Sequence, residues 1–315
     1  MKHPFVKILT CVAIFAMCCI SCKASDNSSR ASEHKVKTTK KTTKSKQPVT
    51  NQESNKDTQL QVVKVKSEKM GRSISNLVVL PEQYLEKDDT TTYPVLYLLH
   101  GYSDDYMAWQ NHVDLRQYAN EYHFIIVCPD GQDSWYFDSP IDPTFQFETY
   151  VTQELRSYIE SNYRTVNNRK YRAITGLSMG GHGALWLAWR HPDIYGLCGS
   201  MSGGVDITTI KDHYKIDKRL GKYAANEASW ESHSVINLVP SLKPENEQFI
   251  IIDDGTSDIF IKDNRALHAA LQRHKIKHDY SERPGRHSWD YWVESLNQHL
   301  TAFSNRIHMI QMGDC

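Results

Sequence analysis

The sequence has no excess of charge of either sign. Its 315 residues include 37 Lys or Arg and 37 Asp or Glu, so the formal net charge is zero. A general nucleic-acid-binding protein needs a strongly basic surface to attract phosphate groups, and this balance excludes that class. The proportions of hydrophobic residues (40%) and charged residues (23%) are instead those of an ordinary globular protein.

The sequence also lacks an apolar run long enough to remain in a membrane as a helix. The N-terminal run from Ile8 to Ile20 would form a helix of roughly 20 Å, which is shorter than a ~30 Å hydrocarbon core. Lys2 and Lys7 precede this run, and the combination is typical of a signal peptide. We therefore expect residues 1–22 to direct export and to be removed.

The end of this run is similar to a bacterial lipobox. It reads Cys-Ile-Ser-Cys, with Cys22 in the position of the lipidated residue, and cleavage near Ala24 is the alternative. We expect a lipoprotein of the periplasm or cell surface that touches the membrane through its lipid anchor at most. Residues 23–59 contain nine basic and four acidic residues and almost nothing to bury, so we expect a disordered tether.

Cysteines are scarce in the part of the chain that we expect to fold. Four of the seven lie in or directly after the signal segment, which leaves Cys128, Cys198 and Cys315. Cys128 and Cys198 lie in apolar runs and resemble small buried hydrophobic residues. The sequence predicts no disulfide framework, and no Cys/His spacing resembles a zinc site.

From residue 60 onward, short apolar runs alternate with segments of helical periodicity. We expect strands over residues 61–66, 73–80, 94–99, 124–128, 171–175, 196–201, 249–252 and 277–282. We expect helices over residues 147–163, from the Gly180 region to residue 189, over 262–274 and over 288–306. This alternation predicts an α/β fold with a mostly parallel central sheet and helices on both faces.

The domain expected over residues 60–306 contains one stretch that fits no strand–helix unit. Residues 203–246 are polar and begin with two glycines, so we expect a small insertion. Ligands of open parallel sheets bind at the carboxyl ends of the strands, and we place the insertion near that edge. Residues 307–315 are expected to form a C-terminal tail.

One motif carries a specific chemistry. Residues 176–180 read Gly-Leu-Ser-Met-Gly, follow an expected strand and open an expected helix. This is the sequence context of a nucleophile elbow, a tight turn that exposes a serine hydroxyl at a helix N-terminus. Ser178 is therefore the candidate nucleophile.

A serine nucleophile needs an acid and a histidine, which follow it in that order in this type of fold. The candidate acids, all after one apolar strand, are Asp253, Asp254 and Asp258. His287 lies in a loop between the last strand and the last helix, which suits a base. The other histidines considered fall within helical periods: His182, His268, His274 and His299.

Five segments together resemble the esterase D family of α/β-hydrolases. They are LLHGYSDDYMAW, PDGQDSWYFDSP, GLSMGGHGALWLA, DDGTSDIF and GRHSWDYW, and the resemblance spans roughly residues 60–305. The family includes feruloyl, acetyl-xylan and tributyrin-type esterases, S-formylglutathione hydrolases and mycolyltransferases. The resemblance implies an α/β-hydrolase fold and a serine ester hydrolase that needs neither a metal nor an organic cofactor.

The resemblance also implies roles for individual residues. Ser178 would be the nucleophile, His287 the base and Asp258 the acid of a catalytic triad. The backbone N–H groups of Tyr102 and Met179 would form the oxyanion hole.

Three loop aromatics are candidates for substrate binding, namely Trp109, Trp135 and Tyr136. Together with the export signal, they suggest an esterase that removes feruloyl or acetyl groups from acylated plant polysaccharide or oligosaccharide. An acyltransferase of the same fold is the nearest alternative. A non-catalytic glycan-binding surface lipoprotein is an alternative from another class.

Overall fold

The computed structural model describes residues 58–88, 90–211 and 213–313. The predicted signal peptide, the lipidation candidate Cys22 and residues 23–57 of the predicted tether lie outside these residues. No helix in the part that is described is both long and apolar enough to cross a membrane.

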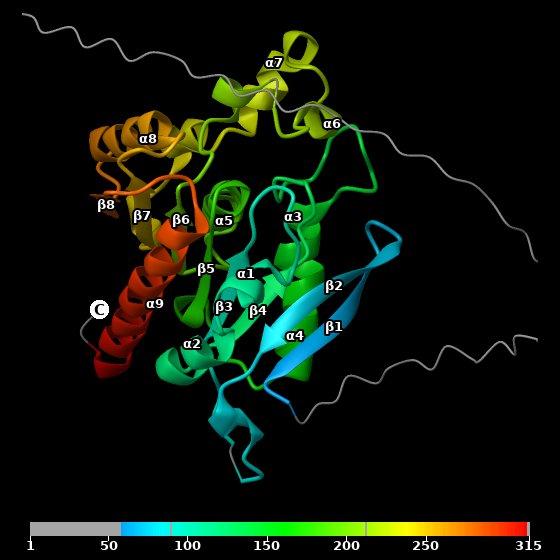
Figure 1. The fold of residues 1–315 in the computed structure, drawn as a ribbon, viewed down its shortest axis with the longest axis vertical. Coiled ribbons are helices and arrows are strands. Elements are labelled where there is room, and N and C mark those ends of the chain that lie inside the picture. Colours follow the sequence, from blue (N-terminus) through cyan, green and yellow to red (C-terminus); the bar gives the residue numbers. More distant parts are fainter. Residues whose placement is uncertain (1–57, 89, 212, 314–315) are drawn as a thin grey trace, which may run out of the picture. The chain divides into compact units, whose positions relative to one another are not determined.

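An eight-stranded sheet forms the centre of the domain (Figure 1). Its strands, in chain order, are β1 (Leu60–Ser67), β2 (Arg72–Val79), β3 (Val95–Leu99), β4 (Ile125–Pro129), β5 (Arg172–Gly176), β6 (Leu197–Met201), β7 (Phe249–Gly255) and β8 (Asp279–Arg283). They lie side by side in the order β1-β2-β4-β3-β5-β6-β7-β8. The pairs β1–β2 and β2–β4 are antiparallel and all others are parallel, which confirms the prediction of a mostly parallel sheet.

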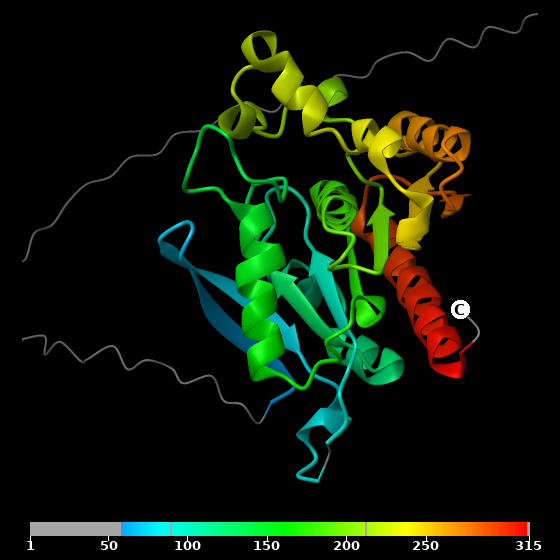
Figure 2. The same ribbon diagram turned by 180° about the vertical axis from the view of Figure 1, so that it is seen from behind.

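Helices cover both faces of this sheet. The longer ones are α2 (Leu115–Tyr122), α4 (Arg156–Asn162), α5 (Met179–Arg190), α8 (Ile261–Arg273) and α9 (Trp289–Met312). The apolar faces of α2 and α9 pack together against one side of the sheet, in front in Figure 1, whereas α4, α5 and α8 pack against the other, which Figure 2 brings forward. Every residue of β3, β4, β5 and β6 is buried, as expected for parallel strands covered on both faces.

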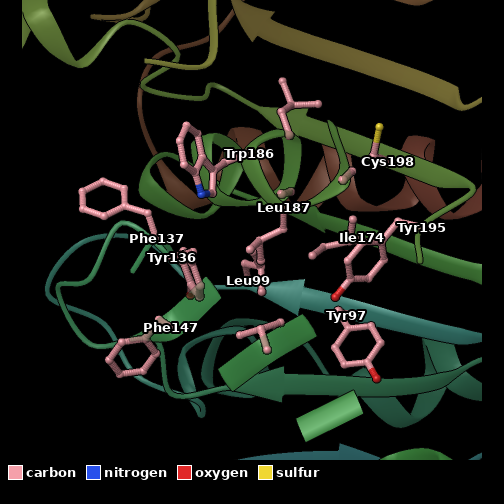
Figure 3. Packing of buried hydrophobic residues seen from close by; sticks show 14 of the residues in the cluster. Tyr97, Leu99, Tyr136, Phe137, Phe147, Ile174, Trp186, Leu187, Tyr195 and Cys198 are labelled. Carbon is pink, nitrogen blue, oxygen red and sulfur yellow. The ribbon is translucent and has the colours of Figure 1, made fainter. Parts of the chain in front are cut away.

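The larger of the two cores lies between the sheet and α5. Figure 3 shows Trp186 and Leu187 of α5 packed with Leu99 of β3 and Ile174 of β5. Burying each large apolar side chain contributes about 1.5–3 kcal/mol relative to its exposure to water. This packing fixes α5 on β3 and β5, whose carboxyl ends carry the loops of the candidate site.

The predicted helix over residues 147–163 is present as a continuous helical segment. It consists of α3 (Phe147–Thr149), a π-helical stretch (Tyr150–Leu155) and α4. Outside the insertion, helices α1 (Ala108–His112) and α2 were not predicted. In α2, Leu115, Tyr118, Ala119 and Tyr122 recur at helical spacing and pack on the core, so this helix had an apolar period that the sequence analysis missed.

The last helix is longer than its sequence pattern suggested. α9 continues to Met312 instead of ending near Arg306, so the tail expected from residue 307 is helical over most of its length. Ile307 is buried against the sheet, and the helix ends at Gly313, which has a φ of 81°. Glycine adopts this left-handed conformation at little cost and is a common helix terminator.

The predicted insertion between β6 and β7 is present. It contains α6 (Asp217–Leu220), α7 (Tyr223–Ser232) and three 3₁₀ helices (Ile207–Ile210, Val235–Ser241 and Pro244–Asn246), and it lies at the top of both ribbon views. The guanidinium of Arg219 bonds Asp133 at 2.6 Å and Asp142 at 3.1 Å. Since both acids follow β4, the insertion is fastened to loops at the carboxyl end of the sheet.

Candidate active site

Ser178 occupies a sharp turn between β5 and α5. Its φ of 54° and ψ of −115° are unusual for a residue with a side chain, and Met179 begins the helix directly afterwards. The Ser178 N–H donates to the carbonyl of Met201 at 3.0 Å, which ties the turn to β6. A conformation of this kind persists only because surrounding contacts hold it, and here it leaves the hydroxyl partly exposed at a helix N-terminus.

The turn is possible because two neighbouring residues have no side chain. A Cβ on Gly176 would lie 2.7 Å from the Gly180 backbone, and a Cβ on Gly180 would lie 2.6 Å from the His100 carbonyl oxygen. Both distances are too short for real contacts. The glycines of the Gly-x-Ser-x-Gly motif thus let α5 approach β5 and β3 closely.

His287 and Asp258 reach Ser178 from two other loops. The Ser178 hydroxyl lies 2.9 Å from His287 Nε2, and His287 Nδ1 lies 3.0 and 2.9 Å from the two carboxylate oxygens of Asp258. A carboxylate can only accept hydrogen bonds, so with both Asp258 oxygens at Nδ1 the ring proton lies on Nδ1, and Nε2 accepts from the serine. The Asp258 side chain is fully buried, whereas the His287 side chain is 20% exposed.

Backbone hydrogen bonds between the loops after β7 and β8 bring these residues together. The Thr256 N–H donates to the Arg283 carbonyl at 2.8 Å, and the Ser257 N–H donates to the Gly285 carbonyl at 2.9 Å. Asp258 follows the first loop and His287 the second, so their mutual position is set by main-chain geometry. Phe260 also packs edge-on against the His287 ring, with centroids 5.2 Å apart.

The other two candidate acids have different partners. Asp254 accepts from the Asn264 amide at 2.9 Å and from the Gly255 N–H at 2.8 Å. Burial, followed by the nearby charge of Asp258, raises the pKa of Asp254. Asp253 accepts from the Ser295 hydroxyl at 3.0 Å. Of the three acids, Asp258 alone is hydrogen-bonded to His287.

The remaining histidines that we considered also have separate surroundings. His299 is fully buried in α9, where its Nδ1 lies 2.8 Å from the Thr175 hydroxyl. His182 is buried in α5, and its Nε2 lies 2.9 Å from the His233 carbonyl oxygen. His268 and His274 belong to α8 and its C-terminal end.

The Asp253 carboxyl gives a pH-dependent stability that can be measured. Burial raises its pKa to about 7, although Ser295 and Arg283 lower it in part. Between pH 4 and 7 the folded protein then holds a proton that the unfolded chain has lost, so stability falls as pH rises through this window. Asp253→Asn lacks this titration. The free energy of unfolding of the variant minus that of the wild type should therefore rise with pH between pH 4 and 7, by up to about 1.4 kcal/mol per pH unit. Urea unfolding at pH 4.5, 6 and 7.5 tests this, and a pH-independent difference would contradict it.

The two candidate oxyanion donors lie beside the serine. Within the described residues, neither the Tyr102 N–H nor the Met179 N–H has a hydrogen-bond acceptor in the protein. A Cβ placed on Gly101 would lie 3.7 Å from the Ser178 Cβ, so the Gly101–Tyr102 peptide adjoins the nucleophile. Two free N–H groups at this position can donate hydrogen bonds to the negatively charged oxygen of a tetrahedral intermediate and so stabilise it.

His100 orients that peptide, a role that the sequence analysis missed. Its Nε2 accepts from the Gly131 N–H at 2.8 Å, so its Nδ1 carries the proton and donates to the Gly101 carbonyl at 2.7 Å. Because a trans peptide is planar, a carbonyl held by His100 directs the Tyr102 N–H to the opposite side. Burial lowers the pKa of His100 to about 4, which keeps the ring neutral in this role.

The three aromatic residues proposed for substrate binding are all buried. The Trp109 indole N–H donates to the Leu99 carbonyl at 3.0 Å, and its ring packs edge-on against Trp289. Tyr136 lies in the core that Figure 3 shows, and its hydroxyl bonds the backbone of His100. Trp135 is 1% exposed and contacts Tyr214 of the insertion. Their contact with substrate stays a prediction.

Metal-binding clusters were also sought. Across residues 58–88, 90–211 and 213–313, no three His, Cys, Asp or Glu side chains are grouped so that they could hold a metal ion. Cys128 and Cys198 are free and buried, as predicted.

The strand order, the turn after β5 and the serine at its tip define the α/β-hydrolase fold. A family model described as "Putative esterase" matches residues 67–303, and the chain therefore belongs to this esterase family. It is a carboxylic ester hydrolase.

Individual relatives have diverged in activity. The acetyl esterase of Caldicellulosiruptor saccharolyticus is 28% identical over 224 residues, which is 67% of this chain and 84% of that protein. The diacylglycerol acyltransferase/mycolyltransferase Ag85A of Mycobacterium leprae is 26% identical over 241 residues, covering 65% of this chain and 72% of that protein. A solved ferulic acid esterase structure has a TM-score of 0.67 and 27% identity, with 79% of this chain and all of that chain covered.

Proposed function

We propose that the protein hydrolyses carbohydrate-linked feruloyl or acetyl esters, with Ser178, His287 and Asp258 as its catalytic triad. The observation that carries the proposal is the continuous hydrogen-bonded chain from the Ser178 hydroxyl through His287 to the buried Asp258 carboxylate. The similarity to an acetyl esterase and to a ferulic acid esterase supports the choice of acyl groups.

The first half-reaction follows from the protonation states of these groups. His287 Nε2 removes the Ser178 proton as the serine oxygen attacks the ester carbonyl, and Asp258 stabilises the resulting imidazolium. The Tyr102 and Met179 N–H groups donate to the oxyanion. His287 then gives the proton to the departing alcohol, and an acyl-serine remains.

In the second half-reaction, water replaces the alcohol. His287 deprotonates the water, which attacks the acyl-serine carbonyl, and the same two N–H groups stabilise the second oxyanion. Collapse of this intermediate releases the carboxylic acid and returns the proton to Ser178. The cycle uses side chains and backbone of this chain and requires no cofactor.

A substrate panel tests the proposed specificity. We expect kcat/KM to be measurable for p-nitrophenyl acetate, p-nitrophenyl butyrate, methyl ferulate and acetylated xylan, since an acyl-enzyme mechanism places few demands on a short acyl group. Failure to release acid from both methyl ferulate and acetylated xylan would contradict the assignment to feruloyl or acetyl esters. Activity on none of the four would contradict the proposed triad as well.

An acyltransferase is the second candidate, favoured by the similarity to the mycobacterial mycolyltransferase. A transferase would use the same acyl-serine but pass the acyl group to an alcohol. Product analysis with p-nitrophenyl butyrate and added glycerol or xylose distinguishes the two. We expect free butyrate as the main product, whereas a predominant new ester would favour the transferase. A glycan-binding protein without catalysis would give neither product.

We also propose that the protein is exported and anchored through lipid on Cys22, with residues 23–59 as a spacer. The change Cys22→Ala removes the thiol that would carry the lipid. In a detergent phase partition, we expect wild type in the detergent phase and the variant in the aqueous phase. Cys18→Ala, within the segment expected to be cleaved, is the matched control and should partition like wild type. A Cys22→Ala protein that still follows the membranes would contradict lipidation.

A further inference from the structure

Tyr214, in the insertion between β6 and β7, lies next to the oxyanion loop. Its ring meets the ring of Tyr102 nearly at a right angle, with centroids 5.3 Å apart and an interplanar angle of 77°. Both tyrosines are partly exposed, unlike Trp109, Trp135 and Tyr136. The two rings therefore form a partly exposed aromatic corner. Tyr102, one of the two residues, also carries a candidate oxyanion N–H group.

The backbone that presents Tyr214 is held in an unusual conformation. Tyr214 and Lys215 have consecutive positive φ angles of 57° and 52°, although neither is glycine. The Trp135 indole N–H donates to the Tyr214 carbonyl at 3.4 Å, and the Lys215 ammonium lies 3.7 Å from Asp133. Residues in such conformations persist where the surroundings over-determine them, and they are frequent at ligand sites.

Contacts beneath Tyr214 lead directly to the nucleophile. The Trp135 ring packs edge-on against Tyr214, and its far edge lies 3.1 Å from where a Cβ on Gly204 would be. The Gly204 N–H in turn donates to the Ser178 carbonyl at 3.2 Å. Buried Trp135 thus lies between the nucleophile turn and Tyr214, and the partly exposed Tyr214 ring is the one available to a substrate.

The chemistry of the ester assigns a side of the site to this corner. The alcohol oxygen must lie within reach of His287 Nε2 to be protonated, so the alcohol part extends past residues 284–288. With the alcohol part on the His287 side, the remaining side for the acyl part is that of the oxyanion loop, where Tyr102 contacts Tyr214.

We infer that Tyr214 is a specificity-determining residue that selects planar aromatic acyl groups. This inference rests on the proposed esterase function. The Tyr214 and Tyr102 rings contact the ring of a hydroxycinnamoyl group by offset or edge-on packing. Such contacts change binding by roughly 2- to 13-fold. An acetyl group, which has only one methyl beyond the carbonyl, does not extend to Tyr214.

The test compares two substrates with the same leaving group, 4-nitrophenyl ferulate and 4-nitrophenyl acetate, so that only the acyl side differs. In Tyr214→Ala, we expect kcat/KM for the ferulate to fall by roughly 2- to 13-fold and kcat/KM for the acetate to stay within a factor of about two. Tyr214→Phe retains the ring and should resemble wild type. Tyr223→Ala removes a tyrosine of the same insertion that packs on Trp230, and should leave both substrates unaffected.

The result separates this inference from the proposed function. Equal changes in kcat/KM for both substrates in Tyr214→Ala, or a higher kcat/KM for the ferulate, would overturn the role of Tyr214. Turnover of these esters by the wild type would still support the proposed esterase function. A selective fall in kcat/KM for the ferulate in Tyr214→Ala alone among the three variants, with unchanged melting temperature, would support the role of Tyr214. No turnover of either ester by wild type would overturn the proposed function, and the inference with it.

Discussion

Ser178→Ala should reduce kcat for p-nitrophenyl acetate by a factor on the order of 10⁶. The hydroxyl is the only group that can form the acyl intermediate in the proposed mechanism, and the other site residues cannot replace it. Initial rates with purified protein measure the effect. The fold should be preserved, because the Ser178 side chain has a single hydrogen bond, to His287, and the turn itself is held by backbone contacts.

The matched control for this change is Ser232→Ala. Ser232 lies in α7 of the insertion, and its hydroxyl donates to the Ser229 carbonyl, so it should affect neither kcat nor KM. Thermal unfolding of both variants checks that any loss of rate is not a loss of structure. A Ser178→Ala protein with wild-type turnover would show that hydrolysis occurs elsewhere on the molecule.

Asp258→Asn should lower kcat by about 10⁴. An asparagine amide can donate to Nδ1 of His287, which would leave the ring proton on Nε2. That nitrogen could then no longer accept the proton of Ser178. We expect the loss in kcat rather than in KM, because Asp258 is buried behind His287 and does not contact the substrate.

Two neighbouring acids provide sharp controls. Asp254→Asn and Asp253→Asn should cost far less activity, since these carboxylates are bonded to Asn264 and Ser295 rather than to His287. Both have raised pKa values, so an amide imitates the protonated form that burial favours. If Asp254→Asn proved the damaging change instead, the identification of Asp258 as the acid would be wrong.

The main features of the fold were predictable from the sequence because they have local signatures. Continuous apolar runs of five or six residues bounded by turn signals, such as residues 94–99 and 124–128, are typical of buried strands, and each strand is found near its predicted position. The glycines around Ser178 are likewise a local requirement, because the turn needs close backbone approach on both sides. The order serine, acid, histidine along the chain then limited the candidate acids to Asp253, Asp254 and Asp258 and favoured His287 as the base.

Other features depend on contacts that no local pattern encodes. His100 acts through hydrogen bonds to Gly101 and Gly131, and the second of these belongs to a loop some thirty residues away. The burial of Trp135 and the position of Tyr214 depend on how the insertion folds back over the β4 loop. α9 continues past Arg306 because Ile307 is buried against the sheet. The helix α2 is different, since its apolar residues recur at helical spacing and could have been recognised in the sequence.

The most direct test of the account is the site of covalent labelling by a serine-directed fluorophosphonate. Such a probe reacts with a serine whose proton is removed by a neighbouring base, and the adduct can be located by peptide mass spectrometry. We predict one adduct per molecule, on Ser178, that is lost in Ser178→Ala and forms much more slowly in Asp258→Asn. An adduct on a different serine, or undiminished ester hydrolysis in protein fully labelled on Ser178, would contradict Ser178 as the nucleophile.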